Sequence, residues 1–247
     1  MTSIDHASMQ RTTATATATE ASGKNISRSL GALLIFDALL MFAPLAVLGA
    51  AIGWPASLGN PAAEQLAAIH ANADMVALGY GLYLLYSVLV APVMIGMAVK
   101  VLGGLHRPAA ATVAAFAALS ALARAIGILR WLTVMPALAA AHAVAGPDQQ
   151  VQIELVFSAV TLYGGGIGEV LGVSLFMALS LGTLCAAALR SGGMPRWLAV
   201  LGLASAVLLA GLLLPVFGGP ELVPVAAAVS LLSLWMLAAG VWALRRG

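Results

Sequence analysis

The chain has 247 residues, of which 62% are hydrophobic and only 8% are charged. Soluble domains carry about 25% charged residues because the surface of a globule needs polar cover, so this composition excludes an ordinary soluble fold. The net charge of +2 does not indicate a nucleic-acid partner, since the basic residues flank apolar runs instead of forming a soluble patch. The sequence therefore predicts an all-α, polytopic integral membrane protein.

The first 27 residues are polar and of low complexity, with Thr and Ala alternating from Thr12 to Thr19. They offer too little apolar area to offset the entropy of ordering, so residues 1–27 are expected to form a disordered tail. The apolar run that begins near Leu30 is long enough to remain as a membrane anchor and is not typical of a cleaved signal peptide. A six-helix transmembrane domain is predicted over residues 28–247.

Six apolar runs are long enough to cross a hydrocarbon core of about 30 Å, which takes roughly 20 helical residues. They are Leu30–Gly53, Met75–Leu102, Ala109–Ala143, Gly166–Leu189, Trp197–Phe217 and Leu222–Leu244. The third run exceeds this length, so its membrane section is expected over Ala115–Pro136. Short surface helices on the outer side are expected from Asn60 to Asn72, with Asn60-Pro61 as the N-cap pair, and over residues 151–163.

Basic residues gather on one side of the membrane under this arrangement. Nine of the eleven Lys and Arg residues fall there, namely Arg11, Lys24, Arg28, Lys100, Arg107, Arg190, Arg196, Arg245 and Arg246. The first, third and fifth connections contain no Lys or Arg but do contain acidic residues. Because cytoplasmic loops carry the excess of Lys and Arg, both termini are predicted to be cytoplasmic.

Four ionisable residues interrupt the apolar runs: Asp37 in the first, Arg124 and Arg130 in the third, and Glu169 in the fourth. A charge deep in a bilayer costs at least about 2.5 kcal/mol, so it usually faces the bundle interior and has a partner. Depths estimated at about 1.5 Å per residue pair Asp37 with Arg124, and Arg130 with Glu169. One interpretation is that these pairs only fix helix packing. The other is that this polar cluster surrounds a binding site or proton path.

The surroundings of Glu169 suggest space for a ligand, because a run of small residues precedes it. Arg130 would offer planar donors to a carboxylate or phosphate, and Tyr163 would close one wall. Tyr83 and Tyr86 are further candidates for a cavity wall. Glycines at four-residue spacing in the fourth run predict close helix packing; they are Gly164, Gly168 and Gly172.

Candidates for a metal site are His70, Asp74 and His142, all on the outer side. His70 and Asp74 are spaced by four residues, and imidazole with carboxylate suits a zinc-like ion. No HExxH or His-x-Cys pattern accompanies them, so we expect interfacial polar residues and identify no metal or cofactor. The single Cys185 lies in an apolar run and offers no disulfide or CxxC pair.

Three short motifs carry a family resemblance. They are the segment His70-Ala-Asn-Ala-Asp74, the segment Ala123-Arg124-Ala-Ile-Gly127, and the turn Met194-Pro195-Arg196-Trp197-Leu. With these motifs, the chain from about Ser29 to Trp242 resembles a bacterial family of multi-span proteins, domain of unknown function 4386. The resemblance implies a helical bundle in the bacterial inner membrane and brings no established activity. The long polar tail and the abundance of Ala depart from the pattern expected of a member.

Three functions remain open on the sequence. The first is a bundle that binds or transports a small ligand at the intramembrane polar cluster. The alternative is a non-catalytic membrane scaffold or accessory subunit of a larger complex. An intramembrane enzyme ranks last, because no metal ligands or nucleophile occur at convincing spacing. Membrane lipids are the expected partners, together with other membrane proteins or a second copy of this chain.

Overall fold

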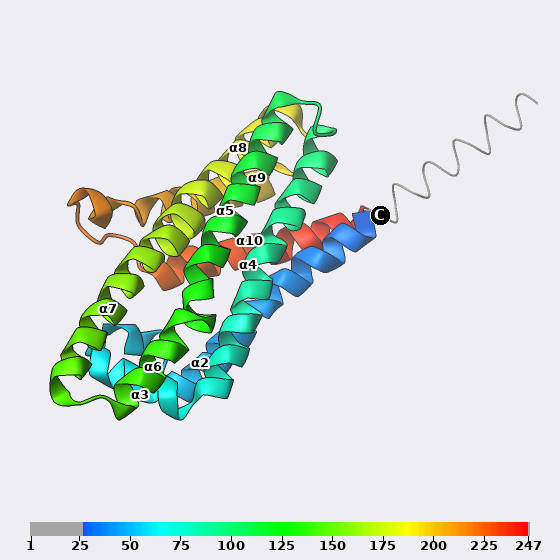
Figure 1. The fold of residues 1–247 in the computed structure, drawn as a ribbon. Helices are drawn as coiled ribbons and strands as arrows, with labels where there is room; N and C mark the ends of the chain where they lie inside the picture. Colours follow the sequence, from blue (N-terminus) through cyan, green and yellow to red (C-terminus); the bar gives the residue numbers. More distant parts are fainter. Residues whose placement is uncertain (1–26, 247) are drawn as a thin grey trace, which may run out of the picture.

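The computed structural model describes residues 27–246 (Figure 1). The predicted tail, residues 1–27, lies outside the described residues except for Ser27. The elements in chain order are a helix over residues 27–40, α2 (Phe42–Ile52), the short 3-10 helix η1 (Ala56–Gly59), α3 (Ala62–Ala71), α4 (Ala73–Leu102), α5 (Pro108–Leu132), α6 (Val134–Val144), α7 (Pro147–Gly165), the π-helix η2 (Gly166–Phe176), α8 (Met177–Ser191), α9 (Arg196–Gly211), the 3-10 helix η3 (Leu214–Phe217) and α10 (Val225–Arg245). The described residues contain no strand.

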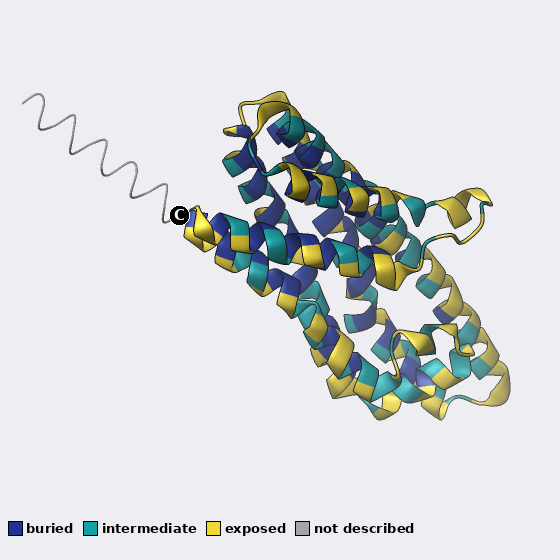
Figure 2. Cartoon of the chain, turned by 180° about the vertical axis from the view of Figure 1, so that it is seen from behind, coloured by how far each residue is buried: buried dark blue, intermediate teal, exposed yellow. Residues whose placement is uncertain are grey.

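These elements combine into six segments that are long and apolar enough to cross a membrane, as the sequence predicts. The first joins residues 27–40 to α2, the third joins α5 to α6, and the fourth joins α7, η2 and α8. Exposed residues lie along the outer faces of the bundle (Figure 2), and many Leu, Val and Phe residues are among the exposed ones, as expected where lipid replaces water. The chain is thus a multi-pass helical membrane protein.

Prolines mark two interruptions within the spans. Proline has no N–H and its ring clashes with the carbonyl four residues earlier, so the helix is weakened at that point. Pro44 lies just after the turn at Met41, and Pro136 lies just after the break at Thr133 that separates α5 from α6. Pro92 lies within α4 without ending it.

One predicted boundary is wrong. The separate surface helix expected over residues 151–163 is part of α7, which continues through η2 into α8 as one segment of 45 residues. The fourth span was expected to begin at Gly166, but the glycines near Glu169 lie against α5 and the backbone stays helical on both sides of that position. A crossing needs only roughly 20 residues, so the first turns of α7 project past the hydrocarbon core, where they pack on α3 and α6.

The predicted short helix after the first span is present as α3, although its N-cap is Pro61 and no side chain caps it. It ends at Asn72, whose side-chain amide donates a hydrogen bond to the carbonyl oxygen of Ala68 at 3.0 Å. Asn72 has φ −126° and ψ 31°, which is outside the helical region, so α4 starts as a new helix. Leu66 and Ile69 of α3 are buried, so α3 is packed onto the bundle.

Both ends of the described chain lie at the same end of the bundle (Figure 1). The Ser27 hydroxyl donates to the carbonyl oxygen of Ala243 at 3.1 Å, which ties the first helix to α10. The loops that carry Arg107 and Arg196 lie at this end as well, and we call it the basic end. The opposite end carries the acidic loops, including Asp148, and we call it the acidic end.

Candidate functional site: a pocket lined by two arginines

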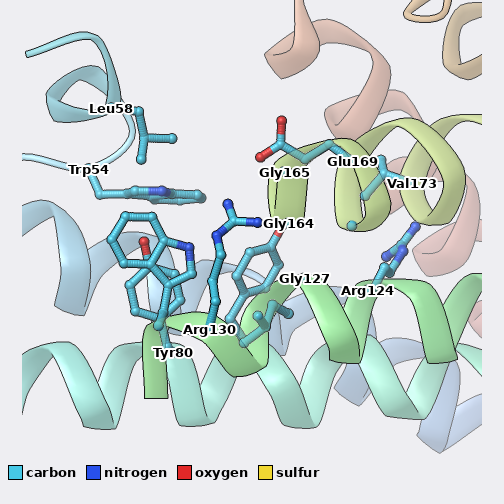
Figure 3. A pocket seen from close by; sticks show the side chains of 14 residues that line it. Trp54, Leu58, Tyr80, Arg124, Gly127, Arg130, Gly164, Gly165, Glu169 and Val173 are labelled. Carbon is cyan, nitrogen blue, oxygen red and sulfur yellow. The ribbon is translucent and has the colours of Figure 1, made fainter. Parts of the chain in front are cut away.

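A pocket opens in the half of the bundle that lies toward the acidic end (Figure 3). Its walls come from α4, α5, the junction of α7 and η2, and the loop with η1 that follows α2. Its lining residues are Trp54, Leu58, Tyr80, Tyr83, Arg124, Gly127, Ile128, Arg130, Trp131, Gly164, Gly165, Gly168, Glu169 and Val173. The cavity volume is about 40 Å³, within an open space of about 420 Å³ that includes the mouth. That leaves room for a few waters or one compact polyatomic group.

Arg130 projects from α5 into the mouth of this pocket, between Trp54 and Gly165 (Figure 3). An ideal Cβ on Gly164 would lie 2.5 Å from its Nη1 and 2.6 Å from its Cδ, so only glycine leaves room for this side chain. The guanidinium carbon lies 5.5 Å from the centroid of the Trp131 ring, within the range of a cation–π contact. Its Nε is buried and has no hydrogen-bond partner.

Arg124 lies deeper, and only 3% of its surface is exposed. Its Cγ packs where a Cβ on Gly172 would lie, 2.8 Å away. The guanidinium carbon lies 5.9 Å from the centroid of the Tyr86 ring. Both Nε and Nη2 are buried without a hydrogen-bond partner. Because arginine only donates hydrogen bonds, these two atoms need an acceptor, and no hydrogen bond supplies one among the described residues.

Aromatic rings form the wall toward the acidic end. The rings of Tyr80 and Trp131 are stacked, with centroids 4.7 Å apart and an angle of 5° between their planes. Phe157 packs edge-on against Trp131 at 6.3 Å, and Trp54 lies 5.8 Å from Tyr83. The Tyr80 hydroxyl is buried without a partner. This wall is therefore rigid and apolar, with one free hydroxyl.

Glu169 lies at the rim of the pocket, on the π-helical turn. Its side chain is exposed, and Figure 3 shows its carboxylate at the same opening as the Arg130 guanidinium. A π-helix is rare and frequently occurs at functional sites. The Ser174 hydroxyl donates to the Glu169 carbonyl oxygen at 3.0 Å, which supports this wider backbone.

The predicted pairs are not direct contacts. Among the described residues no ion pair within 4.0 Å joins Asp37 to Arg124 or Arg130 to Glu169. Arg124 still acts electrostatically on Asp37, and Arg130 acts on Glu169, so depth identified the right neighbours. Asp37 is fully buried outside the pocket lining, with both carboxylate oxygens unpartnered.

The pocket also differs from the prediction in its walls. Tyr163 is 75% exposed and does not line it, because α7 turns this side chain outward. Tyr83 does line it, whereas Tyr86 contacts Arg124 behind it. The sequence analysis missed Trp54 and Trp131 as wall residues. For Trp131 the signal was its place beside Arg130, but Trp54 reaches the site only because the loop after α2 folds back over the bundle.

The metal candidates do not come together. His142 Nε2 lies 3.0 Å from Glu154 Oε1 on α7, and the break at Asn72 separates His70 from Asp74 onto two helices. Over residues 27–246, no three His, Cys, Asp or Glu side chains are grouped so that they would hold a metal ion. Near the acidic end, His142 thus pairs with Glu154, while His70 and Asp74 are separate side chains.

Comparison with known proteins gives a family and no closer relative. No curated protein and no solved structure matches the chain. One family model, domain of unknown function (DUF4386), matches residues 29–247. The match covers all six membrane-spanning segments and the whole pocket, so the chain belongs to the DUF4386 family.

Proposed function

We propose that this protein binds a small organic anion in the pocket between Arg124 and Arg130. The observation that carries the proposal is a pocket lined by two arginines, each of which has at least one buried donor without a hydrogen-bond partner among the described residues. A buried group left without its hydrogen bond costs about 1–3 kcal/mol, and more when it is charged. A ligand that supplies acceptor oxygens removes this cost. No ion pair within 4.0 Å joins either arginine to its neighbouring carboxylate among the described residues.

The charge of the lining indicates the charge of the ligand. Two arginines and one carboxylate, Glu169, line the pocket, so the lining has a net charge of +1, while Asp37 lies near Arg124 outside the lining. A monoanion would neutralise the lining, and a carboxylate or a phosphodiester matches the planar donors of arginine. Glu169 at the rim would partner Arg130 when the site is empty and would disfavour a dianion by repulsion.

The lining of the pocket indicates that the ligand also has an apolar part. The cavity volume is about 40 Å³, which suits a compact anionic head group. The rings of Trp54, Tyr80 and Trp131 offer flat faces beside it. Ligand sites combine such apolar walls with a few polar groups that fix orientation. The same site supports either binding or transport.

The side of the membrane from which the ligand enters follows from loop charge. The basic end carries the loop arginines, and the positive-inside rule assigns that end to the cytoplasm. We therefore propose a bacterial inner-membrane protein whose termini are cytoplasmic and whose pocket lies in the outer half. The ligand would enter from outside the cell or from the outer leaflet.

The test is thermal unfolding of the purified protein with a panel of monocarboxylates, phosphodiesters and neutral analogues of equal size. A ligand at a hundredfold excess over its Kd stabilises the folded state by about 2.7 kcal/mol. Arg130→Gln should weaken binding about tenfold or more, because a hydrogen bond to a charged group contributes about 1.5–3 kcal/mol. Arg190→Gln removes the same charge at the basic end and should leave binding unchanged.

Three outcomes contradict the proposal. The first is that no anion shifts the unfolding temperature. The second is that neutral analogues stabilise the protein as much as anions do. The third is that Arg190→Gln weakens binding as much as Arg130→Gln. That result would show that binding depends on the overall charge of the protein and not on the pocket.

A further inference from the structure

A second group of basic residues, separate from the pocket, converges on one indole ring at the basic end. Lys100 Nζ lies 5.4 Å from the centroid of the Trp242 ring, and Arg246 Cζ lies 6.0 Å from the same centroid. Lys100 also donates a hydrogen bond to the Ser27 hydroxyl. Three segments that are far apart in sequence thus meet here: the start of the first helix, the end of α4 and the end of α10.

This group has no acidic counterpart among the described residues. The seven acidic residues of the range 27–246 are Asp37, Glu64, Asp74, Asp148, Glu154, Glu169 and Glu221, and none of them lies in the segments that form the basic end. No ion pair is formed by Lys100 or Arg246 within that range. Two cations near one ring repel each other, so an anion close to both would relieve this repulsion.

A third donor without a partner belongs to the same group. The Nε1 atom of Trp242 is buried and has no hydrogen-bond partner. An indole N–H only donates, as do ammonium and guanidinium groups. Lys100, Trp242 and Arg246 therefore present donors alone, and a phosphate with several acceptor oxygens is the complementary group.

Apolar surface beside this group indicates the rest of the ligand. Val99 of α4 is 41% exposed, and Val241 and Leu244 of α10 are 42% and 38% exposed. These side chains lie within a few residues of Lys100 and Trp242 along the same helices. In a membrane such a surface contacts acyl chains, and tryptophan prefers the level of the lipid head groups.

We propose that Lys100, Trp242 and Arg246 form a binding site for the phosphate of an anionic phospholipid in the leaflet at the basic end. Basic pockets between spanning helices are suited to such head groups. The lipid would hold the first helix, α4 and α10 together where the two ends of the described range, Ser27 and Arg246, come near each other. This site is distinct from the Arg130 pocket and does not depend on it.

The test is native mass spectrometry of the purified full chain titrated with phosphatidylglycerol or phosphatidylcholine. Wild type should retain phosphatidylglycerol, and Lys100→Gln with Arg246→Gln should weaken this binding about tenfold or more. Arg190→Gln with Arg196→Gln is the matched control, since it removes two charges at the same end and should leave binding within about twofold of wild type. Trp242→Phe keeps the ring but removes the donor, and should weaken binding by a smaller factor.

Several results would overturn the proposal. Equal loss in the two double variants would show unspecific attraction of anionic lipid to the basic end. Equal retention of phosphatidylcholine would show that head-group charge is not recognised. Inorganic phosphate that displaces the lipid completely would indicate a site for soluble anions. Arg246 is exposed at the chain end, so Arg246→Gln alone keeps the test available if the double variant does not fold, and unchanged binding in it would count against the site.

Discussion

At the scale of single residues, the two arginines within the spans lie where no carboxylate of the described residues reaches their donors. Arg124 and Arg130 lie six positions apart on α5, so they point to different sides of that helix. One faces Tyr86 near Asp37, and the other faces the aromatic wall and Glu169. Each cation thus has an acidic neighbour close enough to compensate its charge but too far to satisfy its donors.

The coupling between Asp37 and Arg124 gives the first prediction. Arg124→Leu should destabilise the fold by about 3–5 kcal/mol, because it leaves a buried carboxylate without compensation. Adding Asp37→Leu should restore part of the loss, with an interaction energy of about 0.5–3 kcal/mol in a double-mutant cycle. The measurement is reversible unfolding in mixed micelles.

The control for this cycle is Glu221→Leu combined with Arg124→Leu. Glu221 is an exposed loop residue, so its effect should simply add to that of Arg124→Leu. If the double variant of Asp37 and Arg124 is no more stable than the worse single variant, the two residues do not compensate each other.

The sequence was sufficient to find four charges within the apolar spans and to name, for each arginine, a carboxylate that it acts on electrostatically. It was not sufficient to show whether a pair touches, because that depends on helix rotation and on differences of a few ångströms. Asp37 illustrates this limit, since its predicted partner is near but leaves both of its oxygens free. The aromatic wall could not be predicted either, because a loop brings Trp54 to the pocket and no local sequence pattern indicates the path of that loop.

At the scale of elements, the contact between α5 and η2 is a contact of backbones. A Cβ on Gly127 would lie 2.7 Å from the Cα of Gly168 and 2.9 Å from the carbonyl oxygen of Gly164. The Ser120 hydroxyl adds to this contact by donating a hydrogen bond to the Gly172 carbonyl oxygen at 2.7 Å. The four-residue glycine spacing correctly predicted close packing. The π-helical backbone was not predicted, because amino-acid composition does not distinguish a π-helix from an α-helix.

The second prediction compares two glycines in helix interiors. Gly127→Ala should destabilise the protein by about 1–3 kcal/mol, because the added methyl group meets backbone atoms that cannot move aside. Gly81→Ala on α4 meets no atom within 4 Å, so it should be neutral or stabilising by up to about 1 kcal/mol. Thermal unfolding of the two variants measures the difference.

The contrast between these glycines also reports on the pocket. Gly127 lines the pocket and Gly81 does not, so Gly127→Ala should weaken anion binding as well as stability. Equal stability of the two variants would show that α5 and η2 are not held at backbone contact.

At the scale of the whole molecule, the fold separates charge along the bundle axis. The loops at the basic end carry arginines, and those at the acidic end carry carboxylates such as Glu64 and Asp148. The lipid site proposed at the basic end uses Lys100 and Arg246, which flank membrane-spanning segments and contribute to the positive-inside pattern. The anion pocket uses Arg124 and Arg130, which lie within a spanning segment. The sequence predicted this division because charge and apolar length are both local properties.

The last prediction tests orientation. Single cysteines placed at Asp148 and at Asn60, both exposed near the acidic end, should react in intact cells with a maleimide that cannot cross membranes. Single cysteines at His106 and Gly192, near the basic end, should react only after the cells are opened. The native Cys185 is fully buried and serves as an internal unlabelled control. An even number of spans requires both ends of the chain to lie on one side, so a reporter fused after Gly247 should give a cytoplasmic signal. Labelling of Asp148→Cys only in opened cells would reverse the assignment and would place the pocket mouth toward the cytoplasm.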